Sequence, residues 1–295
     1  MRPCRPTSTL RQPDASDLNN TRPEEGTGRP AEPFTERTPR VVSASKLHRA
    51  AARRKAGRFL AEGANSVEAA LTSGAAIEVF CSEDALDRFP DLVGAAATAG
   101  VAVSVVTERG IRDLSDTVSP TGLVALCRSV VRGPGMPTDA PRLVAIGQAL
   151  AEPGNVGTLI RVADALGVDA VWLTEGGVDP ENTKAVRASA GSLFHVPVVR
   201  GVSEADLVDR AHSQGLQVAV ATADGEVDVE HADDVLARPT AWIFGNEAHG
   251  VPDELAAAAD LRVRIPIRGR AESLNIVTAA SICLHTSARL QTGDS

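Results

Sequence analysis

The second half of the chain alternates uninterrupted apolar runs with segments of helical periodicity. Strands are expected at residues 143–146, 170–173, 196–199, 217–221, 240–244 and 261–265. Helices are expected at residues 156–166, 183–190, 205–213 and 274–290. Strands that are apolar along their whole length are typical of a parallel sheet covered by helices on both faces. Aromatic residues make up only 3% of the chain, and Tyr is absent. Both observations favour an α/β fold over an aromatic-rich β-sandwich.

Changes of composition along the 295 residues predict two domains. Residues 1–38 are rich in Pro, Thr, Arg and Glu and lack apolar periodicity, so they are expected to form a disordered tail. Residues 39–131 alternate strands and helices and predict a smaller α/β domain, with one helix over 45–56. The Pro- and Gly-rich residues 132–141 are expected to be a linker, and residues 142–295 form the second domain.

The charge of the chain is unevenly distributed. The net charge is −8, yet between Glu36 and Glu62 there are eight Lys or Arg and only these two acids. A local basic excess on an acidic chain indicates a surface that binds a polyanion, whereas a solvated helix face explains it equally well. The candidate RNA-binding residues in this run are Lys46, Arg49, Arg53, Arg54 and Lys55.

Cysteine and histidine spacing gives no indication of a metal site. The four cysteines are far apart without a CxxC pair, which is typical of buried thiols in a reducing compartment. The N-terminus has no apolar signal segment, and no stretch is long and apolar enough to span a membrane. We therefore expect a cytoplasmic protein without metal or membrane.

Three polar, turn-rich segments lie directly against apolar strands or helices of the second domain. They cover residues 152–161, 243–250 and 265–275. Polar groups just outside the strand ends of an α/β sheet can converge on a ligand, so the three segments predict one site. No segment has the Lys-Ser/Thr of a P-loop, and no G-x-G-x-x-G follows a strand. Nucleotide-triphosphate and dinucleotide sites are therefore disfavoured.

Each candidate residue in these segments also has a structural explanation. Asn155 follows Pro-Gly and is suited to cap a helix, and Arg161 lies further along it, where Arg usually faces solvent. Ser273 and Asn275 precede an apolar helix and can serve as caps. Glu247 is either an acceptor within the site or a surface carboxylate. The residues alone leave these alternatives open.

Taken together, the three segments resemble the signature motifs of the SpoU (TrmH-like) family of SPOUT RNA ribose 2′-O-methyltransferases. The likeness rests on Asn155 to Arg161, on Gly245-Asn-Glu with Gly250, and on Ile265-Pro with Ser273-Leu-Asn275. It implies a parallel sheet with a deep trefoil knot, which is a rare exception to unknotted topology. It also implies that the protein binds S-adenosylmethionine in the knot loops and works as a homodimer.

The resemblance assigns roles to individual positions. The implied cofactor-binding residues are Gly245, Ile265 and Leu274. The implied catalytic residues are Arg161, at the target ribose, and the surrounding Asn155, Glu247, Ser273 and Asn275. A ribose hydroxyl is a poor nucleophile, so the site must align it with the methyl donor and assist loss of its proton. An Arg is normally fully charged, which favours stabilisation of the alkoxide over a role as base. Lys184 and Arg187 resemble a basic segment that faces RNA.

The first domain resembles the ribosomal-protein-like substrate-binding domain of SpoU enzymes that act on ribosomal RNA. The likeness covers Lys46 to Gly63 and Asp113 to Val124, and it is strongest to the branch with the thiostrepton-resistance enzymes. This makes large-subunit (23S) ribosomal RNA the expected substrate and transfer RNA the alternative. A non-catalytic RNA-binding assembly factor is a further alternative, which the intact set of site residues disfavours.

Overall fold

The computed structural model describes residues 32–135 and 140–292. The predicted tail lies outside these residues except for its last seven. Those seven are ordered, because Phe34 donates its backbone N–H to Val105 O (2.8 Å) and packs against the core of the N-terminal sheet. The predicted tail was therefore too long at its C-terminal end. The gap at 136–139 falls within the predicted linker.

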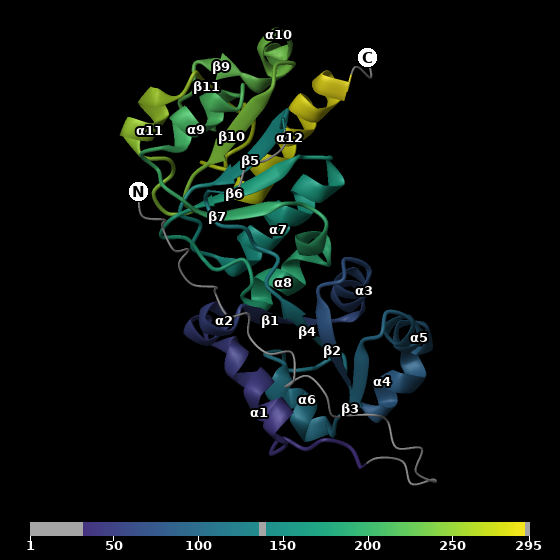
Figure 1. Ribbon diagram of the computed structural model, residues 1–295. Helices are drawn as coiled ribbons and strands as arrows, with labels where there is room; N and C mark the ends of the chain where they lie inside the picture. Colours follow the sequence, from purple (N-terminus) through teal and green to yellow (C-terminus); the bar gives the residue numbers. More distant parts are fainter. Residues whose placement is uncertain (1–31, 136–139, 293–295) are drawn as a thin grey trace, which may run out of the picture. The chain divides into compact units, whose positions relative to one another are not determined.

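A four-stranded mixed sheet organises the N-terminal part (Figure 1). Its strands are β1 (Arg58–Glu62), β2 (Ala76–Cys81), β3 (Ala102–Val105) and β4 (Leu123–Arg128), in the order β1-β4-β2-β3. Strand β4 is antiparallel to β1 and β2, and β2 is parallel to β3. The helices are α1 (Pro39–Ser45), α2 (Ala50–Ala56), α3 (Ala64–Thr72), α4 (Glu83–Arg88), α5 (Pro90–Thr98) and α6 (Glu108–Leu114). Helices α1 and α6 pack on one face of this sheet, and α3, α4 and α5 pack on the other.

The single helix predicted over residues 45–56 is wrong. The chain forms α1, a 3₁₀ turn η2 (Lys46–His48) and α2, with Arg49 in an extended conformation between the turn and α2. The break leaves the carbonyl groups of Leu47 and His48 without helical partners. Both accept hydrogen bonds from Arg53 Nη1, at 2.9 and 3.0 Å. A side chain one turn further on therefore satisfies the broken end, as buried backbone groups require.

A seven-stranded sheet forms the C-terminal part, and every pairing in it is parallel. Its strands are β5 (Leu143–Gly147), β6 (Ala170–Thr174), β7 (Val198–Val202), β8 (Gln217–Ala221), β9 (Val227–Asp228), β10 (Thr240–Phe244) and β11 (Leu261–Arg264). Their order is β7-β6-β5-β10-β8-β11-β9. The predicted α/β fold with a parallel sheet is confirmed. The two-residue strand β9 was missed.

Helices cover both faces of this sheet, as the apolar strands predict. They are α7 (Pro153–Ala165), α8 (Thr183–Ser189), α9 (Leu207–Ser213), α10 (Asp233–Leu236), α11 (Asp253–Ala258) and α12 (Ile276–Thr292). Along β6, Val171 and Leu173 pack in the cluster under α7, α8 and α12, whereas Trp172 packs in the cluster under α9 and α11. Neighbouring residues thus alternate between two buried faces. The trefoil knot stays a prediction.

The segment between the sheets is partly integrated into the fold. Arg132 forms a parallel bridge with Val199 at the β7 edge, donating to Val198 O and accepting from Arg200 N at 2.8 and 2.9 Å. The predicted linker therefore begins as an extra strand residue. Nearby, the rings of Phe59 and Phe194 stack with centroids 5.8 Å apart.

Among the described residues, no helix is long and apolar enough to cross a membrane, and no group of His, Cys, Asp and Glu is arranged to hold a metal.

Candidate active site

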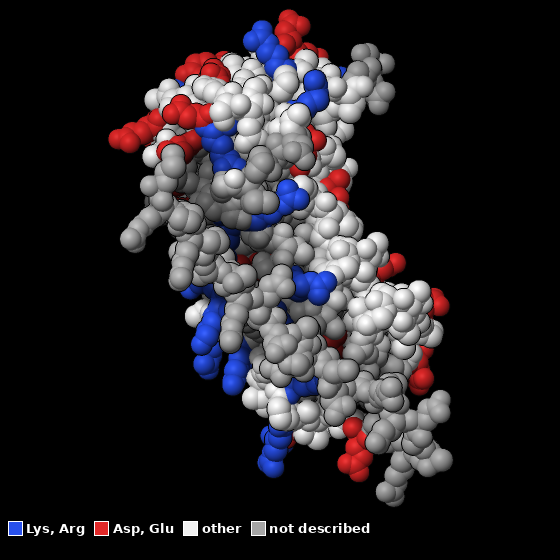
Figure 2. Space-filling view, viewed as in Figure 1, with Lys and Arg blue, Asp and Glu red and all other residues white. Residues whose placement is uncertain are grey.

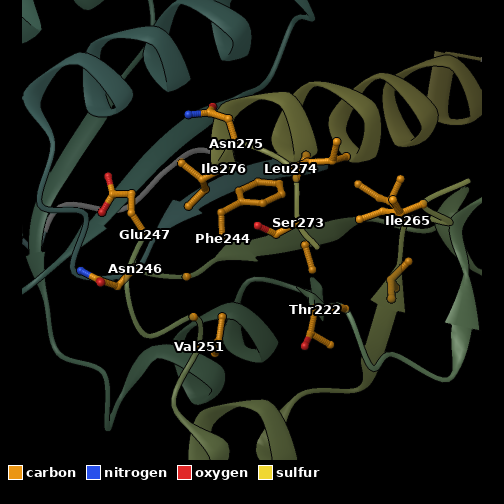
Figure 3. A pocket seen from close by; sticks show the side chains of 17 residues that line it. Thr222, Phe244, Asn246, Glu247, Val251, Ile265, Ser273, Leu274, Asn275 and Ile276 are labelled. Atoms are coloured by element: carbon orange, nitrogen blue, oxygen red, sulfur yellow. The ribbon is translucent and has the colours of Figure 1, made fainter. Parts of the chain in front are cut away.

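A cavity of about 580 Å³ opens at the carboxyl ends of β8, β10 and β11; we call it the β10 pocket (Figure 3). Parallel α/β sheets place their ligand sites at this edge. Figure 3 shows Asn246 and Glu247 at one side of the pocket and Ile265 at the opposite side. The wall contains residues of the second and third predicted segments, including the expected cofactor-binding Gly245, Ile265 and Leu274 and the expected catalytic Glu247, Ser273 and Asn275.

Gly245 has no room for a side chain. A Cβ at this position would collide with the backbone of Gly250 and Val251. The loop closes on itself here, since Asn246 N donates to Gly250 O at 3.0 Å and Gly250 N donates to Asn246 O at 2.9 Å. Gly250 itself has φ +69°, a conformation that glycine adopts without strain. Both glycines of the motif are therefore needed for the path of the backbone beside the pocket.

The structure brings the three predicted segments together. Asn155 Nδ2 donates to Glu247 Oε1 at 2.9 Å, and Asn275 Nδ2 donates to Asn155 Oδ1 at 3.4 Å. Glu247 also accepts the backbone N–H groups of Ala151 and Glu152, at 3.1 and 3.3 Å. A row of three side chains, Glu247–Asn155–Asn275, thus ties β10's loop to the starts of α7 and α12.

The hydrogen bonds at Glu247 affect its acidity. Partial burial acts to raise the pKa of Glu247, but the hydrogen bonds from Asn155 and from the backbone of Ala151 and Glu152 outweigh it. The net result is a pKa below the ordinary value. Glu247 is therefore an ionised acceptor at neutral pH, and it holds the loop after β5 against the loop after β10.

Asn155 and Asn275 differ in whether they cap a helix. Helix α7 begins at Pro153, and Asn155 lies inside its first turn without capping it, so the predicted cap at Asn155 is wrong. The missing N–H of Pro costs nothing at the first helical position, which explains the earlier start. Asn275 does cap α12, since its Oδ1 accepts Val277 N at 2.9 Å. Its amide group still reaches Asn155, so Asn275 has both functions.

Arg161 is not part of the β10 pocket of its own chain. It lies on α7 between one and two turns beyond Asn155, with its side chain exposed. Among the described residues it has no hydrogen-bond or ion-pair partner, and it does not line the pocket. Among the described residues of a single chain, no arginine lines the β10 pocket.

Several pocket residues were missed. Asn246 bridges two loops, with Nδ2 on Ala149 O (2.7 Å) and its backbone N–H on Gln148 Oε1 (3.2 Å). Thr222 enters the wall because β8 is the neighbour of β10 in the sheet. Asn246 lies inside the quoted Gly-Asn-Glu motif and could have been named from it. Thr222 depends on strand order, which the sequence does not reveal.

The predicted RNA-binding residues fall into two groups. Lys46, Arg49, Arg54 and Lys55 are exposed, and Figure 2 shows basic side chains projecting over α2. Arg53 is only 3% exposed, and its Nε and Nη2 bind Asp179 Oδ2 at 3.0 and 2.7 Å. Its guanidinium is held by partners within the protein, and a contact of Arg53 with RNA stays a prediction.

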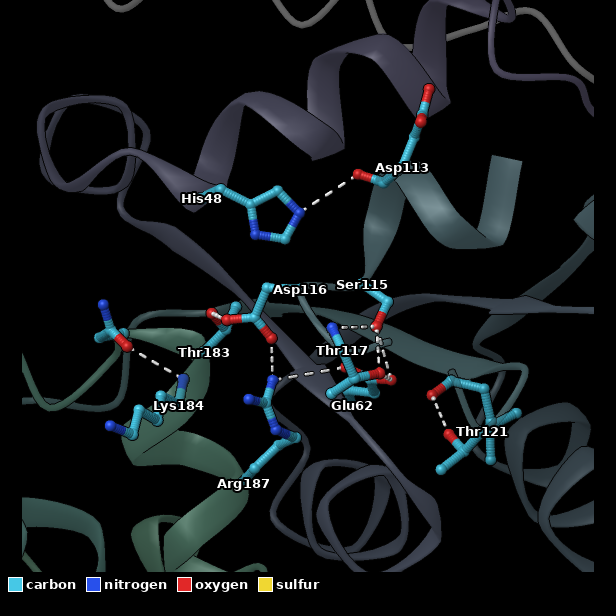
Figure 4. A network of polar contacts seen from close by, with 12 residues as sticks. His48, Glu62, Asp113, Ser115, Asp116, Thr117, Thr121, Thr183, Lys184 and Arg187 are labelled. Carbon is cyan, nitrogen blue, oxygen red and sulfur yellow. Dashed lines mark hydrogen bonds and ion pairs between the residues drawn. The ribbon is translucent and has the colours of Figure 1, made fainter. Parts of the chain in front are cut away.

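The two predicted basic residues of α8 are also paired within the protein. Arg187 forms an ion pair with Asp116 and lies 3.6 Å from Glu62 Oε2, in a network that includes Thr183 and Ser115 (Figure 4). Arg187 thus connects α8 to the N-terminal sheet, and its contact with RNA stays a prediction. The exposed Lys184 Nζ lies 3.4 Å from Glu152 Oε2, a weak surface pair that leaves it accessible to RNA.

Comparisons with known proteins agree with this geometry. The SpoU rRNA Methylase family model matches residues 142–285, and the MRM3-like substrate binding domain matches residues 38–125. The 23S rRNA (guanosine(2553)-2′-O)-methyltransferase RlmP of Bacillus subtilis is 33% identical over 247 residues, covering 83% of this chain and 94% of RlmP.

Two solved structures have the same fold along most of their length. An RNA 2′-O ribose methyltransferase is 31% identical with a TM-score of 0.76, covering 88% of this chain and 99% of that one. An rRNA methyltransferase from Sinorhizobium meliloti, solved with bound AdoMet, is 29% identical with a TM-score of 0.73, covering 85% and 94%.

Proposed function

The chain belongs to the SpoU rRNA methylase family, and we propose that it transfers a methyl group from S-adenosylmethionine to a ribose 2′-hydroxyl of 23S ribosomal RNA. The observation that carries this proposal is the hydrogen-bonded row Glu247–Asn155–Asn275 at the mouth of the β10 pocket. It joins the three segments on which the resemblance rests. The relative RlmP, which is similar over nearly its whole length, acts on 23S rRNA, and this favours ribosomal over transfer RNA.

The β10 pocket fits S-adenosylmethionine in size and chemistry. Its volume of about 580 Å³ lies within the range of small-molecule sites. Ile265, Leu274 and Phe244 provide apolar surface, and the glycine-containing loop 245–250 brings backbone groups to the wall. When bound, the cofactor supplies a methyl group already activated by its sulfonium. The chain must therefore hold the cofactor through Gly245, Ile265 and Leu274, and align the acceptor oxygen.

The polar row and Arg161 supply the remaining chemistry. Ionised Glu247 fixes Asn155, and Asn155 with Asn275 and Ser273 frames the place of the ribose. Arg161 lowers the energy of the oxygen as its proton leaves, because a fixed guanidinium stabilises negative charge that develops in the transition state. Its ordinary charged state makes this role easier than that of a base.

The protein works as a homodimer in this proposal, with Arg161 of one protomer serving the pocket of its partner. Arg161 is exposed and lies outside the pocket of its own chain. Two-fold symmetry would complete both sites at once. Leu274 and Ile267 are the large apolar side chains left exposed beside the β10 pocket among the described residues, which suits a protein interface there.

The N-terminal part, over residues 39–131, holds the RNA and acts as a domain distinct from residues 142–295. Lys46, Arg49, Arg54 and Lys55 give it an exposed basic surface that suits phosphate contacts. Work on ribosomal RNA implies a cytoplasmic location.

The experiment is to incubate the purified protein with S-adenosylmethionine and unmodified 23S rRNA transcript, and to map 2′-O-methyl groups. We expect one methylated ribose in 23S rRNA and none in a transfer RNA transcript pool. Methylation of transfer RNA alone would overturn the substrate assignment. Cofactor binding without methylation of either RNA would favour the assembly-factor alternative.

A further inference from the structure

A second cavity, of about 280 Å³, lies beside β7 and does not share residues with the β10 pocket. We call it the arginine pocket. Its charged lining consists of four arginines and two carboxylates: Arg53, Arg54, Arg132, Arg200, Asp179 and Glu181. The N-terminal and the C-terminal parts both contribute. Arg53 and Arg54 come from α2, whereas Asp179 and Glu181 follow β6 and Arg200 lies in β7.

The carboxylate of Asp179 is neutralised within the pocket. Its Oδ2 accepts Arg53 Nη2 at 2.7 Å, and its Oδ1 accepts Arg200 Nη1 at 3.0 Å. Arg53 is buried and also bound to two carbonyl groups, so this part is a rigid floor. Two guanidinium groups against one carboxylate leave a positive charge there.

One oxygen of the Glu181 carboxylate is held by donors from the protein. Its Oε1 accepts Ser129 Oγ at 2.7 Å and Val130 N at 3.0 Å. Burial is the largest influence on Glu181 and raises its pKa above the ordinary value, with Asp179 adding to the effect against these hydrogen bonds. Even with Glu181 ionised, the four arginines outnumber the two carboxylates of the lining, so the pocket keeps an excess of positive charge.

Two arginines at the mouth are left without an acidic partner. The side chains of Arg54 and Arg132 are exposed, and neither forms an ion pair within the described part of the chain. The backbone of Arg132 is fixed by its bridge to β7. Gly57, Gly133 and Gly201 also line the cavity, and a Cβ at any of them would meet only open space. An extended ligand can therefore approach both guanidinium groups without steric hindrance.

The arginine pocket lies at the same edge of the seven-stranded sheet as the β10 pocket. Its residues Asp179 and Glu181 follow the carboxyl end of β6, and Arg200 lies within β7. From β7 to β10 the sheet order runs through β6 and β5. Three strand spacings of about 4.8 Å separate β7 from β10 by roughly 14 Å across the sheet. One RNA segment can span this distance.

We propose that the arginine pocket binds a backbone phosphate of the RNA substrate a short distance along the strand from the target ribose. This proposal rests on the proposed function, because a phosphate contact here positions the RNA for reaction only if the methyl acceptor lies at the β10 pocket. Guanidinium groups bind phosphate oxygens in a forked geometry, and such contacts set register without reading sequence. The volume of about 280 Å³ lies below the usual range of small-molecule sites, which suits a phosphate group better than a whole nucleotide.

The test measures binding of unmodified 23S rRNA transcript by Arg54→Gln, Arg132→Gln and the double variant over a range of chloride concentrations. Each single variant is expected to lower the slope of log Kd against log salt by about one, and the double variant by about two. Affinity should fall severalfold per substitution at low salt, with S-adenosylmethionine binding unchanged. Both arginines are exposed, so the variants are expected to fold, which the thermal midpoint checks.

Arg238→Gln is the matched control, because Arg238 is exposed, lies before β10 at the opposite end of the strand, and forms no ion pair among the described residues. Slopes for Arg54→Gln and Arg132→Gln equal to that of Arg238→Gln would overturn the proposal. At equal ionic strength, inorganic phosphate should displace the RNA from the protein no better than chloride does. Saturable competition that disappears in Arg132→Gln would reassign the pocket to free phosphate. If Arg54→Gln and Arg132→Gln lower the salt slope but the wild-type protein never methylates RNA, the result would support the pocket and overturn only the methyltransferase assignment.

Discussion

The β10 pocket and the contact between α2 and the segment after β6 place polar side chains in opposite environments. At the β10 pocket, Glu247, Asn275 and Ser273 are exposed, and Leu274 faces solvent. At the contact between α2 and the segment after β6, Arg53 is buried and donates to Asp179, Leu47 and His48. Polar groups meant for a ligand keep free donors and acceptors, whereas polar groups that hold the fold are saturated by protein partners.

Arg53 and Arg54 show the same contrast in adjacent positions. Arg53 points into the protein and stabilises the broken end before α2, while Arg54 is exposed at the mouth of the arginine pocket. Charge and position in the sequence do not distinguish them. They differ only in whether a buried carboxylate lies next to the guanidinium. Removing a charge at an exposed position and at a buried position tests this difference.

The largest expected effect is at Arg161, in the exposed class. Arg161→Ala should lower methyl transfer by roughly 10²- to 10³-fold, because the alkoxide loses its stabilising charge, while S-adenosylmethionine affinity stays the same. Single-turnover methylation and calorimetric cofactor titration measure the two. Arg161→Lys, which keeps the charge but not the forked geometry, should recover part of the rate.

A mixed-dimer experiment shows from which protomer Arg161 acts. Coexpressed with a Gly245→Val chain, which lacks a usable pocket, Arg161→Ala chains should regain roughly a quarter of wild-type activity if each arginine serves the partner's pocket. Absence of recovery in a purified mixed dimer would place Arg161 in its own protomer's site or outside the mechanism.

The next effect is on stability, in the buried class. Asp179→Ala leaves the buried guanidinium of Arg53 without a counter-charge and should lower the free energy of unfolding by about 3–5 kcal/mol. Urea denaturation measures this loss. The control is Asp84→Ala, which removes an ion pair of similar length (2.9 Å) whose side chains are 50% and 71% exposed. Such a pair contributes less than about 1 kcal/mol. Equal losses in the two variants would contradict the contrast between the classes.

The sequence predicted the sheet and the three site segments well, because both depend on local patterns. Continuous apolar strands indicate a parallel sheet wherever they occur, and the Gly-Asn-Glu and Ser-Leu-Asn segments follow or precede regular elements. The break at Arg49 was not predictable, because it is stabilised by tertiary contacts of Leu47 and by Arg53. Local helix propensity carries no information on such contacts.

The pairing of distant charges was equally inaccessible. Asp179 lies 126 positions from Arg53, and Asp116 lies 71 positions from Arg187. A basic residue in the sequence therefore predicts a surface charge unless the fold is known. The residues of the β10 pocket could be predicted because recognisable motif residues, such as the glycines at 245 and 250, lie beside them in the sequence.

The smallest expected effect is at Glu247, whose hydrogen bonds place it between the two classes: it is exposed, yet it accepts three donors from the protein. Glu247→Gln should lower the free energy of unfolding by about 1 kcal/mol at neutral pH, a modest value because solvent screens the carboxylate. The folded-state pKa of Glu247 lies below its ordinary value of 4.5, so its contribution is complete above that pH and disappears as pH falls through the folded-state pKa. The difference in thermal midpoint between wild type and Glu247→Gln should therefore be constant above about pH 5.5 and close in more acidic buffer. Glu254→Gln, which removes an exposed carboxylate of α11, is the matched control. A difference that grew on acidification would mean that Glu247 is held protonated in the fold, and would remove it from the ionised acceptors that tie the three segments together.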